Sequence, residues 1–205
     1  MSKEERIKHE IEEIWYTLLH AKTSFYYADY LFNPPTRQEQ DYMSHGEDML
    51  FFRDVLWRSA VIGLANFFAK DQKRSVVKLL NKLDGGGEFC KVVPRSVIEI
   101  WRSKLTEHDG VIEKIKTLRN KMYAHSEIAY RDSLQFNAFD KDVEILIILV
   151  QDFISTIFTC FNAQVIHGDK LPRNFNTLKI LADYEEKRRD DIVNEYKNFT
   201  KQQNQ

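Results

Sequence analysis

The chain has 205 residues and a formal net charge of −1, from 30 Lys and Arg against 31 Asp and Glu. This length predicts one domain with a sizeable core, and the near-neutral charge argues against a protein whose whole surface binds nucleic acid. With only 7 Gly and 4 Pro, the composition indicates an all-α chain. The charged start of the chain and two cysteines without metal-site or disulfide spacing lead us to expect a cytoplasmic protein with no metal and no cofactor.

Apolar periodicity and helix-end signals predict two long helices in the first half of the chain. The first covers about residues 2–31, has one apolar face and ends at Asn33-Pro34-Pro35. After a polar loop, Ser44 and Glu47 form a capping-box pattern that opens a second helix to about residue 69. This helix is apolar on most sides, which predicts a central, mostly buried element. The apolar positions are Ile7, Ile11, Ile14, Leu18, Phe25 and Leu31 in the first helix, and Phe51, Phe52, Val55, Leu56, Trp57, Val61, Ile62, Leu64, Phe67 and Phe68 in the second.

The second half of the chain predicts shorter elements. The three glycines after Asp84 are interpreted as a linker, because no Lys-Ser/Thr follows them and no strand precedes them. Ser96 and Glu99 form a second capping box, and Asp140 is the expected N-cap of a helix that is apolar but too interrupted by charge to span a membrane. In order, we expect a helix over 75–83, the linker, a helix from Pro94 to about Leu105, a helix over about 111–123, a loop of about fifteen residues to Phe139, a helix over about 140–164 that packs on the second helix, a charged helix over about 177–199, and a disordered tail over 201–205.

Arg119 and His125 are the strongest chemical candidates in the sequence. A guanidinium that stays charged can hold a phosphate, and an imidazole can transfer a proton near neutral pH. At about 100° per residue, Arg119 lies roughly 80° from the apolar stripe of its helix, and His125 would lie about 120° from Arg119. The helix must therefore end or turn near Ala124 for the two side chains to meet. The stripe consists of Val111, Ile115, Leu118 and Met122, and Ile112 and Tyr123 share the flank of Arg119 and are candidates for a dimer surface.

The spacing of Arg and His alone is weak support for a site, because Arg102 and His108 repeat it earlier in the chain. We interpret that earlier pair as accidental, with His108 ending a helix. The alternative for the later pair is an exposed Arg119 and a His125 that caps a helix, where the backbone dipole favours cations. The lysines on the same helix could bind RNA, but the alternative is that they simply form a solvent-exposed helix face.

The run Leu-Arg-Asn-Lys-Met-Tyr-Ala-His-Ser resembles the end of the third core helix of HEPN (higher eukaryotes and prokaryotes nucleotide-binding) domains. In that family an Arg and a polar residue are followed, a few positions later, by a His, and Arg119, Asn120 and His125 match this pattern. The wider run is most similar to the branch named after the abortive-infection protein AbiU. Glu127 stands where some HEPN toxins carry a Tyr that a partner nucleotidyltransferase modifies, so the resemblance does not extend to that regulation.

The resemblance implies a fold, an activity and partners. The fold is an all-α, antiparallel HEPN-type helical bundle with extra N- and C-terminal helices, as one domain over residues 1–200 with its core over about 5–165. The activity is metal-independent RNA cleavage that leaves 2′,3′-cyclic phosphate and 5′-hydroxyl ends, in phage defence or a toxin–antitoxin system. The partners are RNA, a second copy of the chain that shares the cleft, and an antitoxin protein, with no membrane involved.

In this interpretation Arg119 holds the phosphate, Asn120 orients the phosphate or the imidazole, and His125 acts as general acid or base. Two other interpretations stay open. One is a non-catalytic HEPN-like module that binds RNA or a protein partner through the same groove, and the other is a helical dimerisation protein in which the motif is accidental. The candidate RNA-binding residues around the motif are Lys116, Lys121, Tyr123 and Ser126.

Overall fold

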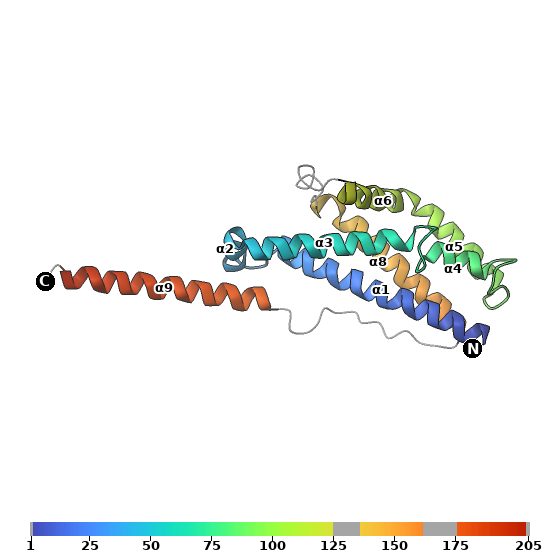
Figure 1. Cartoon of the computed structure of the whole chain (residues 1–205), viewed down its shortest axis with the longest axis horizontal. Helices are drawn as coiled ribbons and strands as arrows, with labels where there is room; N and C mark the ends of the chain where they lie inside the picture. The colour runs from blue at the N-terminus through green and yellow to red at the C-terminus, as the bar shows by residue number, and fades with distance from the viewer. Residues whose placement is uncertain (1, 125–135, 162–175, 204–205) are drawn as a thin grey trace.

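The computed structural model describes residues 2–124, 136–161 and 176–203, and within these ranges the chain is helical throughout its regular structure, with no strand (Figure 1). This confirms the all-α prediction. None of the described helices combines the length and the apolar character that a membrane crossing requires. The helices are α1 (Lys3–Phe32), α2 (Arg37–His45), α3 (Glu47–Phe67), α4 (Val76–Leu83), α5 (Arg95–Glu107), α6 (Asp109–Ala124), α8 (Phe136–Thr159) and α9 (Thr177–Gln203).

The bundle is built on α1 and α3, which lie side by side, run in opposite directions and are joined through α2 at one end (Figure 1). The helix α8 packs mainly on α1 and makes less contact with α3, while α6 packs on α3 and α8. The predicted packing of α8 on α3 is therefore present, but α1 is its main neighbour. All the apolar positions that predicted the first helix are buried, because its regular stripe faces both α3 and α8: Ile7, Ile11, Ile14, Leu18, Phe25 and Leu31.

The expectation that α3 is buried on most sides is wrong for its first half. Trp57, Leu64 and Phe67 lie in the core, but Phe51 and Phe52, together with Val55, are exposed. The helix α6 covers only the later part of α3 (Figure 1). The first half of α3 therefore keeps an uncovered apolar face at the end of the bundle where α2 lies.

The polar loop predicted between the first two helices is in fact the helix α2. Thr36 caps it: the Thr36 hydroxyl accepts a hydrogen bond from the Glu39 N–H, and the Glu39 carboxylate accepts one from the Thr36 N–H. The capping box predicted at Ser44 is wrong, because the Ser44 hydroxyl donates to the Asp41 carbonyl and α3 starts at Gly46 without a side-chain cap. A second helix ends where α3 begins, so Ser44 belongs to the end of α2.

Three other predicted boundaries also differ from the structure. The capping box predicted at Ser96 and Glu99 is wrong, because the N-cap of α5 is Pro94, which has no side-chain acceptor, and the Glu99 carboxylate pairs with Arg95 at 2.9 Å. α8 begins at Phe136, before the predicted cap Asp140, and ends at Thr159; the last part of the predicted helix, 162–164, lies outside the described residues. α9 continues to Gln203, so the predicted disordered tail is helical over 201–203, while 204–205 lie outside the described residues.

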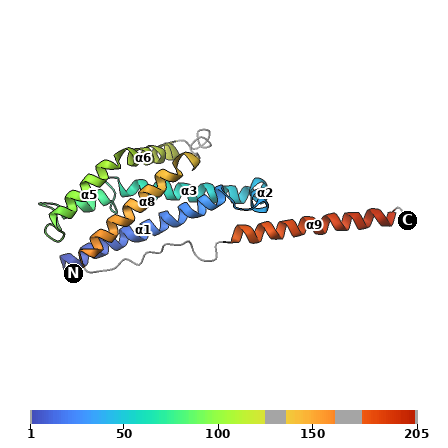
Figure 2. The ribbon, with the colours of Figure 1, turned by 180° about the vertical axis from the view of Figure 1, so that it is seen from behind.

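The C-terminal helix α9 contacts α2 along its first turns, as far as Glu186, which accepts a hydrogen bond from the Gln38 side chain. Leu178 of α9 packs with Leu31 of α1 and Met43 of α2 in a small apolar cluster separate from the main core. Beyond this anchor, α9 extends past the end of the bundle, as both views show (Figures 1 and 2). The anchored first turns thus fix the direction in which the rest of α9 points.

Candidate active site

The helix α6 carries the predicted site and is held from several sides. Ile115 and Leu118, two members of the predicted apolar stripe, are buried in the main core. Ile112, expected on a free flank beside Arg119, is buried as well, because α6 packs on α5 as well as on α3 and α8. This corrects its assignment to a dimer surface. An ion pair of 3.2 Å between Lys114 and Asp142 also ties α6 to α8.

Arg119 is half-buried on α6, where two amide side chains, one from α6 and one from α3, hold its guanidinium. Its Nε and Nη2 atoms donate to Oδ1 of the neighbouring Asn120, at 3.2 Å and 3.0 Å. Its Nη1 atom donates to Oδ1 of Asn66, 3.5 Å away on α3. Asn120, predicted to orient the phosphate or the imidazole, accepts hydrogen bonds from the guanidinium, and Asn66 from a second helix helps to hold it.

Both acceptors at Arg119 are neutral. Within the described part of the chain, Arg119 forms no ion pair with a carboxylate, so its hydrogen bonds direct the guanidinium without cancelling its charge. A guanidinium held in this way keeps the net positive charge that attracts an anion such as a phosphate. The hydrogen bonds of Arg119 therefore leave its positive charge available to hold a phosphate.

Asn66 is the site residue that reasoning from the sequence missed. It lies 53 positions before Arg119 in the sequence, and only the packing of α3 on α6 brings the two together. A signal was nevertheless present, because Asn66 is the one polar side chain in the otherwise apolar stretch from Val61 to Ala69. A lone amide in such a stretch needs a hydrogen-bond partner, and Arg119 supplies one.

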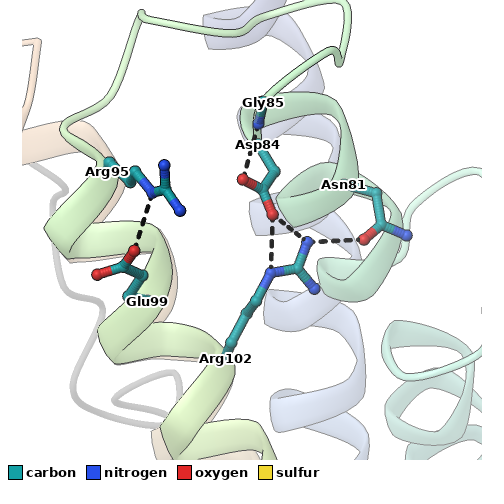
Figure 3. A network of polar contacts seen from close by, with 6 residues as sticks. All are labelled: Asn81, Asp84, Gly85, Arg95, Glu99 and Arg102. Carbon is teal, nitrogen blue, oxygen red and sulfur yellow. Dashed lines mark hydrogen bonds and ion pairs between the residues drawn. The ribbon is translucent and has the colours of Figure 1, made fainter.

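Arg102, the arginine of the earlier Arg102–His108 pair, has different surroundings (Figure 3). Arg102 donates from Nε and Nη2 to one carboxylate oxygen of Asp84, at 3.0 Å and 2.7 Å, and from Nη2 to Asn81 at 3.1 Å. The Gly85 N–H and the Arg102 guanidinium together hold the pKa of Asp84 below its usual range. Arg102 therefore fastens α5 to the end of α4, and its charge is neutralised there.

His108 occupies the C-cap of α5, where one ring nitrogen, Nδ1, lies 2.8 Å from the carbonyl oxygen of Lys104. This confirms the prediction that His108 ends a helix. The single residue His108 separates α5 from α6, so the two helices follow each other without a loop. The imidazole thus has a structural partner in the helix it caps.

The other predicted site residues are only partly brought together. Lys116 is half-buried and pairs with Glu113 at 2.8 Å, which places its charge in a local ion pair. Lys121 is exposed on the last turns of α6. Tyr123 belongs to α6, but its side chain lies outside the described residues, as do His125 and Ser126 entirely. The turn expected between Arg119 and His125 falls in the same stretch and stays a prediction.

An open pocket lies next to the site, between the end of α3, α5 and α6. It is lined by three cations, Lys70, Arg102 and Lys116, and by the carboxylate of Asp109. Arg102 and Lys116 are already paired with carboxylates, which weakens this pocket as an anion site compared with Arg119. Among the described residues, no group of three or more His, Cys, Asp or Glu side chains could hold a metal ion.

The two cysteines are not linked to each other. Cys90 and Cys160 are free and half-buried, and both line an open pocket near the glycine linker. Burial raises the pKa of the Cys160 thiol above its ordinary value. Arg119 does not line this pocket, so the two thiols are separate from the candidate site.

Comparison with known proteins gives one match. A family model of the HEPN class, described as AbiU2, matches residues 4–179, which cover the bundle from α1 through α8 and the first residues of α9. No curated protein and no solved structure matched the chain.

Proposed function

The chain belongs to the AbiU2 branch of the HEPN domains, and from this membership and the geometry of Arg119 we propose that it is a metal-independent endoribonuclease. The observation that carries the proposal is the Arg119 guanidinium, which two amide oxygens orient and no described carboxylate neutralises. Such a group suits the non-bridging oxygens of a phosphate, whose negative charge grows in the transition state.

The proposed reaction is a transesterification within the RNA. The 2′-oxygen forms a bond to the adjacent phosphorus while the bond from phosphorus to the 5′-oxygen breaks, which leaves a 2′,3′-cyclic phosphate and a 5′-hydroxyl. One imidazole takes the proton of the 2′-hydroxyl, and a second gives a proton to the departing 5′-oxygen. Arg119 supplies the positive charge at the phosphate and His125 transfers the protons, so the proposed reaction needs no metal ion.

Two imidazoles are needed, and one chain offers one His125. We therefore propose that two copies pair with their α6 helices near a two-fold axis and share one RNA-binding cleft. Lys121, exposed at the end of α6, lies where such a cleft would receive the RNA backbone. The corresponding biological role is defence against phage or a toxin–antitoxin system in the cytoplasm, with an antitoxin protein as a candidate partner.

The test is to incubate the purified chain with single-stranded RNA in EDTA and to determine the fragment ends by mass spectrometry. Fragments with 2′,3′-cyclic phosphate ends are the expected result. A Lys121→Cys chain, with Cys90 and Cys160 replaced by Ser, is expected to form a disulfide-linked dimer, whereas Ile100→Cys on α5 is not. RNA that stays intact while it is still bound in a gel-shift assay would contradict the nuclease and favour the binding module.

A further inference from the structure

One apolar face runs along most of α9, but the bundle covers only its start. Leu178 and Ala182 are buried beside α2. At about 100° per residue, Ile192, Tyr196 and Phe199 lie within roughly 60° of one another and on the side of α9 that carries Leu178 and Ala182. These three later side chains are 55%, 70% and 57% exposed. The face that binds the bundle therefore continues, uncovered, along the outer half of α9.

The outer half of α9 lies beyond the point where the Gln38 side chain of α2 donates a hydrogen bond to Glu186. All side chains from Lys187 to Lys197 are exposed, and the outer half of the helix lies beyond the end of the bundle (Figures 1 and 2). Clustered exposed apolar side chains of this kind mark a surface that binds another surface.

A matching apolar surface lies at the same end of the molecule. Phe51, Phe52 and Val55 form an exposed face on the first half of α3, next to α2 and therefore close to the place where α9 leaves the bundle. The rings of Phe51 and Phe52 pack edge to face, with centroids 5.9 Å apart. Because α9 points away from this end, its outer half lies beyond the reach of its own α3.

Charged side chains border both apolar surfaces. Glu47 and Asp48, both exposed, make the first turn of α3 acidic. On α9, Arg189 and Lys197 lie beside the apolar side chains, but Glu195 lies there too and Arg189 is paired with Glu185 at 3.9 Å, so this half of the helix carries charges of both signs. The match between the two surfaces is therefore mainly apolar.

We propose that the outer half of α9 docks on the first half of α3 in a second copy of this chain, and that the exchange is reciprocal. With both surfaces at the α2 end, a two-fold axis at that end, distinct from the one proposed near α6, lets each copy's α9 cover the other copy's α3. At one contact, the exposed apolar side chains of α3 and α9 would bury on the order of 700 Å² of surface, which is less than a typical stable interface buries. Two reciprocal contacts approach the roughly 1,600 Å² of a standard interface, which is the reason for choosing a second copy as the partner.

Disulfide trapping between two differently labelled chains tests this proposal, which does not rest on the nuclease activity. In chains with Cys90 and Cys160 replaced by Ser, Phe52→Cys is placed in one chain and Tyr196→Cys in the other. Mixing the two is expected to give a crosslinked heterodimer under mild oxidation. Replacing Phe52→Cys with Ile100→Cys, an exposed position on α5 at the opposite end of the bundle, should reduce the yield at least about tenfold.

A matched pair of substitutions on α9 checks that its apolar face makes the contact. Ile192 and Ile180 are 55% and 57% exposed, but Ile180 lies about 120° around the helix from Ile192. Ile192→Glu in the Tyr196→Cys chain should reduce crosslinking at least about tenfold, and Ile180→Glu should leave it unchanged. Equal yields for both variants would overturn the proposal. So would crosslinks between two Tyr196→Cys chains in place of the mixed pair, because they would show α9 paired with α9.

Discussion

Two Arg–His pairs with the same spacing occur in this chain, and the structure gives the two arginines different partners. Arg102 donates to the carboxylate of Asp84, which neutralises it and makes it a fastener between α4 and α5. Arg119 donates only to the amide oxygens of Asn66 and Asn120 within the described part of the chain. The two pairs share one spacing, so spacing cannot tell them apart. The chemistry of the hydrogen-bond acceptor distinguishes a structural arginine from one that is available to a ligand.

The largest expected difference between the two pairs is in RNA cleavage. Arg119→Ala and His125→Ala should each lower the cleavage rate by about 10²–10⁴-fold, because each removes a group that acts at the phosphate. Arg102→Ala and His108→Ala should leave the rate within about threefold of wild type. Initial rates on one RNA, at equal concentrations of folded protein checked by circular dichroism, provide the measurement. Equal losses from both pairs would mean that the partners of the two arginines do not separate a site residue from a structural one.

A smaller effect is expected when Arg119 is given the kind of partner that Arg102 has. Asn66→Asp places a carboxylate where a neutral amide now accepts a hydrogen bond from Arg119. The new ion pair should lower kcat/KM for RNA on the order of tenfold at pH 7. Asn66→Ala is the control, because it removes the hydrogen bond without adding charge and should cost less than Asn66→Asp. If the two variants lose the same activity, the charge of the acceptor at this position has no influence on function.

The smallest expected effect is on the pH dependence of stability. The pKa of Asp84 is lowered in the folded chain, so its interactions stabilise the fold above its ordinary pKa of about 3.9, and this stabilisation is lost as the pH falls through the lowered value. Arg102→Gln should therefore lower Tm by at most a few degrees at pH 7, and the difference from wild type should shrink below about pH 3.

Arg119→Gln provides the contrast in the same measurement. Its partners Asn66 and Asn120 do not titrate, so any difference in Tm from wild type should stay constant between pH 7 and pH 3. Thermal unfolding followed by circular dichroism across this pH range decides the point. A pH-dependent difference for Arg119→Gln would reveal a titrating partner at Arg119.

The helices that could be predicted best are those whose signals are local. The stripe of α1 was predicted residue by residue, because a regular period on one face is sufficient to mark that face as buried. The helix α2 was missed because its sequence is polar. Its two buried residues, Glu39 and Met43, lose contact with water only because α1 and α9 pack beside it.

The same limit explains the errors on α3 and α6. Apolar residues on most sides of α3 predicted burial, yet Phe51 and Phe52 are exposed, because α6 covers only the later part of that helix. On α6, Ile112 was assigned to a free flank and is buried, because α6 has more than one neighbouring helix. Periodicity reports which faces of a helix are apolar, and it carries no information on how many neighbours the helix has.

The sequence by itself determined the all-α fold, the first helix and its buried face, and the choice of Arg119 and Asn120 as candidate site residues. These follow from local periodicity, composition and a short motif. Only the tertiary structure decided that Asn66 meets Arg119 across two helices and that Asp84 neutralises Arg102. The physical reason is that the free charge of a guanidinium depends on the acceptor beside it in space, and packing brings that acceptor from a distant part of the chain.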